Sequence, residues 1–316
     1  MKAHSLTMTR RDFVAGALAT TAAMASGCAS AVARQHEVID CHTHFYDPTR
    51  PQGVPWPGKN DTQLYRRVLP ADYRRLAAPL GVTGTVVVEA SAWIEDNQWL
   101  LDLAADEPFI KGFVGHLNPG DTEFPQQIKR FARNPLFRGI RVSGGAVNQL
   151  AATEKLGPLR LLAENDLSLD ANGGVDSLAF VATVARTIPA LRIIINHVAN
   201  VRIDGGTPPQ DWIDGMRDAS AQPNVFCKVS GLVEGGGQRH GAPRDEHFYR
   251  PVLDYVWQCF GEDRLVYGSN WPVSELFADF ATVHGIVKSF FTAQGERAAH
   301  KYFSGNARRF YKYRSR

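Results

Sequence analysis

Two histidines separated by one residue, His42 and His44, follow a short apolar run and are the clearest chemical signal in the chain. Side chains alternate along a β-strand, so both imidazoles would point to one side and could hold one metal ion or one substrate group. Other polar residues follow later apolar runs: Glu89, Arg141, Asp170, His197, Lys228 and Asn270. The set combines metal ligands, proton acceptors and cations, which predicts a shared site for acid–base or metal-assisted chemistry.

The elements that would position these residues alternate along the chain. Eight short β-rich runs cover residues 37–41, 85–89, 110–115, 137–142, 167–170, 192–196, 225–229 and 265–267. Helical patterns follow them at residues 71–78, 97–105, 124–132, 154–164, 177–187, 211–219, 246–259 and 278–291. Eight strand–helix units predict an α/β protein with a (β/α)8 TIM barrel. A doubly wound sheet is the rival, but no glycine-rich phosphate loop follows the first run.

In a barrel of this kind the carboxyl ends of the strands carry the chemistry, so polar residues at those ends are candidate site residues. Lys228 lies within an apolar run, where a lysine is costly unless it is paired or used. We expect Arg141 and Lys228, with Asp170, to bind a substrate carboxylate or a developing oxyanion. The alternative is a buried ion pair with Glu89 or Asp170. Trp271 is expected to contact substrate beside them, although packing is an equal alternative for this residue.

The composition indicates an ordinary globular chain with enough apolar material for one large core. Of its 316 residues, 44% are hydrophobic and 21% are charged, which excludes disordered and collagen-like classes. The net charge is +3, and part of it lies in the first residues, so the body of the chain is close to neutral. A nucleic-acid partner is therefore not expected, because it would require a basic face.

The first residues are typical of an export signal rather than of a folded element. Thr9-Arg10-Arg11-Asp12-Phe13-Val14 and a weakly apolar run form a twin-arginine pattern, which predicts a signal peptide over residues 1–33 and a barrel over 36–316. The apolar run is shorter than a membrane-spanning helix requires. Cleavage before Cys28 would yield a lipoprotein, whereas cleavage after Ala31-Val32-Ala33 would not. We expect an exported protein that is periplasmic or anchored to the membrane through Cys28.

Five motifs at the expected strand ends resemble a known family. They are Ile39-Asp40-Cys41-His42-Thr43-His44-Phe45-Tyr46-Asp47-Pro48, Asn196-His197, residues 224–232 (NVFCKVSGL), Tyr267-Gly268-Ser269-Asn270-Trp271-Pro272-Val273 and Gly305-Asn306-Ala307-Arg308. Together they resemble the lactonase branch of the amidohydrolase superfamily, which includes sugar-lactone hydrolases, over residues 36–316. The resemblance implies a metal-dependent-hydrolase-like barrel in which His42, His44 and His197 surround the reacting carbonyl.

The chain departs from this pattern at Asn270, where the lactonase pattern has an aspartate. An amide has no site basic enough to take a proton from water, so Asn270 cannot be the general base. Three alternatives remain. Glu89, Asp170 or a histidine supplies the base while Asn270 orients water or substrate, and Glu89 is the preferred substitute. One divalent metal, with zinc favoured, could instead activate water at His42, His44 and His197. In the third alternative the site has lost hydrolysis.

The sequence thus predicts an exported hydrolase that opens a lactone or a similar cyclic ester by water attack, with or without one divalent metal. The substrate would be a small lactone or a carboxylated sugar-like compound. One rival is a metal-dependent decarboxylase of the same superfamily. The other is a degenerate, non-catalytic lipoprotein that binds a carbohydrate through the same residues.

Overall fold

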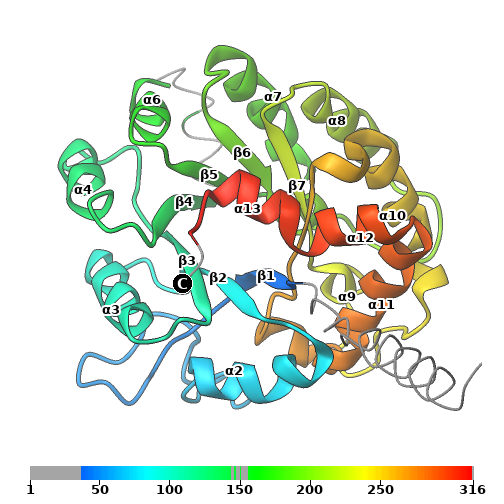
Figure 1. Cartoon of the computed structure of the whole chain (residues 1–316), viewed down its shortest axis with the longest axis horizontal. Coiled ribbons are helices and arrows are strands. Elements are labelled where there is room, and N and C mark those ends of the chain that lie inside the picture. Colours follow the sequence, from blue (N-terminus) through cyan, green and yellow to red (C-terminus); the bar gives the residue numbers. More distant parts are fainter. Residues whose placement is uncertain (1–36, 144–145, 147–149, 151–155, 315–316) are drawn as a thin grey trace, which may run out of the picture. The chain divides into compact units, whose positions relative to one another are not determined.

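A computed structural model describes residues 37–143, 146, 150 and 156–314, so the predicted signal peptide and Cys28 lie outside the described residues. Eight parallel strands pair in sequence order and helices surround them (Figure 1). The strands are β1 Ile39–Thr43, β2 Gly84–Val88, β3 Ile110–Gly115, β4 Phe137–Ser143, β5 Ser168–Asn172, β6 Arg192–Ile195, β7 Val225–Val229 and β8 Leu265–Tyr267. The predicted (β/α)8 barrel is confirmed.

Each predicted helical pattern corresponds to a helix of the barrel. These helices are α2 Pro70–Ala77, α3 Ile94–Ala105, α4 Phe124–Phe131, α6 Gly157–Glu164, α7 Leu178–Thr187, α8 Gln210–Ser220, α10 Glu246–Phe260 and α11 Phe280–Ala293. Short elements supplement them: α9 Leu232–Gly235 after β7, then α12 Glu296–His300, a π-helical turn Lys301–Gly305 and α13 Asn306–Tyr311. In the described part of the chain, none of the helices combines the length and the apolar character needed to cross a bilayer.

The barrel closes between β1 and the segment that follows β8. The backbone N–H of Asn270 donates to the carbonyl of His42 at 2.8 Å, and the N–H of His44 donates to the carbonyl of Trp271 at 2.9 Å. Asp40 supports the same junction, because its Oδ1 accepts the backbone N–H of Ser269 at 2.9 Å. The first and last strand ends are therefore held in contact, which places the histidines of β1 beside Asn270.

Two clusters of buried apolar side chains form the core. The larger one lies between the strands and the surrounding helices. The smaller one joins residues from β1, β2, β3, β6, β7 and β8 to the last helix, α13, which crosses over the strands in Figure 1. The ring centroids of Phe226 on β7 and Phe310 on α13 are 4.9 Å apart. α13 therefore packs against the inner, apolar part of the barrel, which leaves the opposite strand ends for polar residues.

A bulge in β1 turns the histidines into the barrel. Asp40 pairs with Thr85 and Thr43 pairs with Val87, so β1 carries one residue more than β2 over this interval. The bulge interrupts the alternation, since Cys41 belongs to the inner cluster and the next residue, His42, also contacts the inward-facing Lys228. Bulges near active sites commonly redirect a side chain in this way.

Candidate active site

Three histidines from two strand ends meet inside the barrel. The ring centroids of His42 and His44 are 5.0 Å apart, and those of His42 and His197 are 4.2 Å apart. All three side chains are buried. Residues that are more than 150 positions apart in the sequence thus form one cluster, as the spacing of His42 and His44 and the strand-end position of His197 predict.

His197 owes its position to a left-handed turn after β6. Residues 197–200 have φ angles of 52°, 45°, 58° and 47°, and the indole of Trp212 donates to the carbonyl of Val198 at 2.8 Å. Gly231 lies against the imidazole, where a Cβ atom would come within 2.8 Å of the His197 Cβ. The glycine is therefore required for this close approach, and the neighbouring Ser230 Oγ bonds His197 Nδ1 at 2.9 Å.

The three imidazoles are neutral near pH 7. Burial lowers the pKa of His44 to about 3, with the positive charge of Arg141 adding to the effect. Burial also lowers the pKa of His42 well below its usual range, as do the neighbouring His197 and Lys228. His197 follows the same direction for the same reason, with Lys228 as the largest charged contributor. Neutral imidazoles can donate one hydrogen bond and accept another, so the hydrogen-bond partners decide which nitrogen carries the proton.

Lys228 and Asp170 form a completely buried ion pair beneath His42. The Lys228 Nζ lies 2.7 Å from Asp170 Oδ2, and neither side chain is exposed to solvent. Tyr311 on α13 donates to the same Asp170 oxygen at 2.9 Å, and Lys228 Nζ lies 3.3 Å from His42 Nδ1. Lys228 and Asp170 therefore form the buried ion pair that is the alternative to direct binding of a substrate by Lys228. In this arrangement Lys228 contacts His42 instead of an open cavity.

Arg141 and Glu89 form a second ion pair at the ends of β4 and β2. The Arg141 Nε donates to Glu89 Oε1 at 2.8 Å, and Arg141 Nη2 donates to the Glu89 carbonyl at 2.8 Å. Arg141 retains 18% exposure of its side chain. Glu89, the preferred substitute base, is thus engaged by the guanidinium, while Arg141 remains partly accessible to a substrate.

Asn270 connects His44 to Glu234 on α9, an acidic residue that the sequence patterns do not predict as part of the site. The Asn270 Oδ1 lies 3.3 Å from His44 Nε2, and Asn270 Nδ2 donates to Glu234 Oε1 at 2.9 Å. Burial raises the pKa of Glu234 to about 7. The only signal for Glu234 in the sequence is its position shortly after β7, at the end of the apolar pair Leu232 and Val233.

Trp271 is packed into the core. It is 1% exposed, and its ring lies 5.2 Å from Tyr73 and 6.2 Å from Phe45. Its Nε1 donates to Glu275 Oε1 at 2.6 Å. The indole is therefore packed among aromatic side chains, which is the alternative to the predicted substrate contact. This position gives the substrate contact no support.

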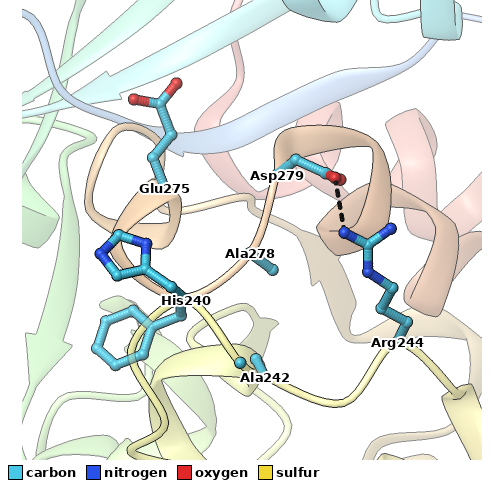
Figure 2. Close-up of a pocket in the computed structure, with 8 residues that line it drawn as sticks. His240, Ala242, Arg244, Glu275, Ala278 and Asp279 are labelled. Carbon is cyan, nitrogen blue, oxygen red and sulfur yellow. Dashed lines mark hydrogen bonds and ion pairs between the residues drawn. The ribbon is translucent and has the colours of Figure 1, made fainter.

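A cavity of about 420 Å³ lies near this tryptophan but is not lined by the three histidines. The loop residues His240 and Arg244 and the segment from Glu275 to Asp279, which follow β7 and β8, form its walls. Figure 2 shows Arg244 and Asp279 joined by an ion pair among the lining residues, with Arg244 Nη2 3.4 Å from Asp279 Oδ2. The cavity is therefore a neighbour of the histidine cluster rather than the cluster itself.

The tautomers of the histidines decide whether the set fits a metal ion. Lys228 is an ammonium donor to His42 Nδ1, so a neutral His42 carries its proton on Nε2, which is buried and has no partner in the described part of the chain. A metal ion requires a lone pair at that nitrogen. Among the described residues, no group of three or more histidine, cysteine, aspartate or glutamate side chains is arranged to hold an ion. The zinc set predicted at His42, His44 and His197 does not fit this arrangement.

Comparison with known proteins gives consistent matches over the barrel. The amidohydrolase family matches residues 39–313. An L-fucono-1,5-lactonase from Burkholderia ambifaria is 35% identical over 281 residues, covering 87% of this chain and 95% of the relative. An L-fucono-1,5-lactonase from Burkholderia multivorans is 28% identical over 287 residues, covering 86% and 95%. The crystal structure of an amidohydrolase from Burkholderia multivorans with bound zinc has a TM-score of 0.78 at 25% identity, covering 88% of this chain and 99% of that chain.

Proposed function

Because the chain belongs to the amidohydrolase family, and is therefore a hydrolase, we propose that it opens a lactone ring by attack of water on the ester carbonyl. The observation that carries the proposal is the buried Nε2 of His42, which has no hydrogen-bond partner among the residues that the structure describes. Lys228 donates to the other ring nitrogen and leaves the proton on Nε2. His42 therefore offers a fixed N–H donor to a carbonyl oxygen inside the barrel.

This donor suits ester hydrolysis. Negative charge develops on the carbonyl oxygen when water adds, and a preorganised donor in a buried site stabilises that charge more than it stabilises the neutral carbonyl. The ammonium of Lys228 behind the ring strengthens the effect, while Asp170 and Tyr311 hold Lys228 in place. Arg141 supplies a second, partly exposed cation for the oxygen atoms of the substrate.

The proposed substrate is a six-membered sugar lactone of the kind named for the Burkholderia relatives, L-fucono-1,5-lactone. Identity of 35% over almost the whole length of the barrel supports this class. The polar groups of the site, with donors at His42 and Arg141 and an acceptor at Glu234, match the hydroxyl and carbonyl oxygens of such a ring. Asn270 orients these groups and does not take up the proton itself.

A pH-indicator assay with the purified full-length chain tests this function. We expect turnover of L-fucono-1,5-lactone well above its spontaneous hydrolysis, with other aldonolactones as comparison substrates. Treatment with a chelator should leave most of the activity, because the His42 Nε2 is assigned to a proton rather than to a metal. Complete loss after chelation, with recovery on adding zinc, would contradict the metal-independent part of the proposal.

Substitution at His42 tests the carrying observation. His42→Phe keeps an aromatic ring but removes the N–H donor, so kcat should fall by roughly 100-fold or more, as for the loss of one oxyanion donor. His247→Gln is the control, because this side chain is 74% exposed and its partner is Asp245, outside the histidine cluster. Thermal stabilisation by the lactone without turnover would favour the non-catalytic lipoprotein, and carbon dioxide release from a carboxylated substrate would favour the decarboxylase.

We also propose that residues 1–33 direct export by the twin-arginine route, with Cys28 as a lipid-anchoring residue. The support is the paired Arg10 and Arg11 ahead of a weakly apolar run and the small residues that precede Cys28. Replacing both arginines by lysine should retain the protein in the cytoplasm in a cell-fractionation experiment. Cys28→Ser should move the exported protein from the membrane fraction to the soluble periplasm. An unchanged distribution in both variants would overturn the proposal.

A further inference from the structure

Four carboxylates lie beside the histidine cluster, and their partners differ. Both oxygens of Asp40 are occupied, since Oδ1 accepts the backbone N–H of His42 and Oδ2 accepts the hydroxyl of Tyr73. Asp170 is paired with Lys228, and Glu89 is paired with Arg141. Glu234 forms no ion pair in the described part of the chain, and its Oε1 accepts the side-chain amide of Asn270 at 2.9 Å. Its second oxygen, Oε2, is buried and has no hydrogen-bond partner within the described ranges 37–143 and 156–314. A buried carboxylate oxygen with no partner is costly, so this atom points to a ligand or a role.

The surroundings of Glu234 suit a proton acceptor that works near neutral pH. Burial is the largest effect on its pKa, which rises to about 7, and the hydrogen bond from Asn270 opposes the rise. The ionisable residue that responds to its charge is Tyr249 on α10, whose pKa is raised mainly by burial and then by Glu234. A base with a pKa near the working pH can accept a proton and later return it.

Asn270 holds Glu234 in a fixed relation to the cluster. The residue lies at the end of β8 with a φ of 59°, a conformation that asparagine tolerates better than most residues. Its backbone N–H is bonded to His42 and its side-chain oxygen faces His44 Nε2 at 3.3 Å. The amide nitrogen then points to Glu234. Asn270 thus bridges the imidazoles and the free carboxylate.

We propose that Glu234 is the general base that activates water for lactone opening and that Asn270 is the residue that positions it. This role rests on the proposed lactone hydrolysis. Glu89 is the base that the sequence favours, but in the structure this carboxylate is paired with Arg141. Glu234 remains available as a base.

Glu234, His42 and one water molecule suffice for both stages of the reaction, which are the addition of water and the collapse of the intermediate. The Glu234 carboxylate takes one proton from water while the water oxygen bonds to the carbonyl carbon and the carbonyl electron pair moves to its oxygen beside His42. When the intermediate collapses, the bond between that carbon and the ring oxygen breaks. The ring oxygen leaves with the electron pair and receives the proton from Glu234. The product is the open-chain hydroxy acid, and Glu234 is again a carboxylate.

The substitution Glu234→Gln tests the role, because glutamine keeps the size and the acceptor for Asn270 but cannot take a proton. On L-fucono-1,5-lactone we expect kcat to fall about 100-fold or more with KM little changed, as for the loss of a general base. In the wild type, kcat/KM should rise with pH through about 7 as Glu234 ionises, and this limb should be absent in the variant. The buried histidines cannot produce that limb, since their pKa values are depressed.

Exchanging the two partners provides the sharper experiment. In Glu234→Gln/Asn270→Asp the carboxylate and the amide change places across the same hydrogen bond, so a carboxylate again stands at the cluster. We expect at least a tenfold recovery of kcat over Glu234→Gln. Glu246→Gln is the control, because that carboxylate on α10 is paired with Arg250 and lies outside the site.

The outcomes separate this role from the function itself. Wild-type turnover together with a Glu234→Gln variant that keeps more than a third of kcat and the limb near pH 7 overturns the role of Glu234 alone. Absence of wild-type turnover on the lactone panel overturns the proposed function, and the role of Glu234 with it. If Glu234→Gln does not unfold cooperatively in a thermal melt, Glu234→Asp replaces it. That variant should retain the limb with a lowered kcat, and an unchanged kcat would count against the role.

Discussion

Two ion pairs flank the histidine cluster, and they differ in their access to solvent. Lys228 and Asp170 lie 2.7 Å apart with no exposure of either side chain, whereas Arg141 and Glu89 lie 2.8 Å apart with exposures of 18% and 9%. Charges removed from water are costly unless they are fully compensated, and Tyr311 and His42 complete the hydrogen bonding of the enclosed pair. The enclosed pair is therefore a support for His42, and the open pair is the one that can meet a substrate.

The two ion pairs are built from the same kinds of residue, one cation and one carboxylate each, yet they have different roles. All four residues lie in or directly after strands of the same barrel, so their positions in the chain do not distinguish them. Lys228 acts through the imidazole it touches, and Arg141 keeps part of its guanidinium available. The same comparison explains why Glu234 stands out: it is a carboxylate of the cluster that lacks a cation among the described residues.

The largest effect is expected from breaking the enclosed pair. Asp170→Asn leaves the buried ammonium of Lys228 without its counter-charge, which should lower the free energy of unfolding by about 3–5 kcal/mol. Urea denaturation followed by fluorescence measures it. The double variant Asp170→Leu/Lys228→Met should recover much of the loss, because no charge then remains in the core. A loss below about 1 kcal/mol in Asp170→Asn would show that the pair is not enclosed as described.

A smaller effect on stability, with a clear effect on activity, is expected from the open pair. Arg141→Met should lower kcat/KM for the lactone by roughly 10- to 100-fold, since it removes a cation beside the substrate, while the free energy of unfolding changes by about 1 kcal/mol. Steady-state kinetics and urea denaturation measure the two quantities. Arg130→Met, at the exposed pair with Glu95, is the matched control and should change neither strongly. Equal losses of stability at Arg141 and Asp170 would remove the distinction between the pairs.

The smallest effect is the contribution of one buried imidazole to the dependence of stability on pH between pH 7 and 6, which reports the histidines between the pairs. Their pKa values lie below 6.5 in the folded protein, so below pH 6.5 the unfolded chain binds more protons. Stability should therefore be complete above that pH and fall as the pH drops toward the folded pKa, about 3 for His44. Each histidine contributes at most about 1.4 kcal/mol per pH unit. Urea denaturation at pH 7, 6 and 5 measures the slope, which should be shallower in His44→Gln and unchanged in His247→Gln.

Much of the site could be predicted from local sequence because it depends on strand ends. The apolar runs identify the strands, and the spacing of His42 and His44 places both imidazoles on one side of β1. The same reasoning places Lys228 on the inner face of β7 beside Phe226, which belongs to the inner core cluster. Short-range periodicity carries this information along a regular strand such as β7. In β1 the bulge between Asp40 and Thr43 interrupts the alternation and turns His42 inward.

Other features depend on contacts that the linear order does not show. Lys228 pairs with Asp170, 58 positions away, and Arg141 pairs with Glu89, 52 positions away. From the sequence alone, either of these cations could have paired with either of these acids. Glu234 carries no motif of its own. Its importance follows from the amide of Asn270, which is 36 positions away and comes within 2.9 Å only because β7 and β8 are neighbours.

The sequence by itself determined the barrel, the strand-end histidines and the absence of a basic group at Asn270. These properties follow from residue types and from periodicities of a few residues, which local chain geometry converts directly into structure. Only the tertiary structure decided which charges are neutralised, which nitrogen of His42 carries its proton and which carboxylate remains free. Those properties depend on burial and on distances of about 3 Å between residues far apart in the chain, where a small displacement changes both a hydrogen bond and a pKa.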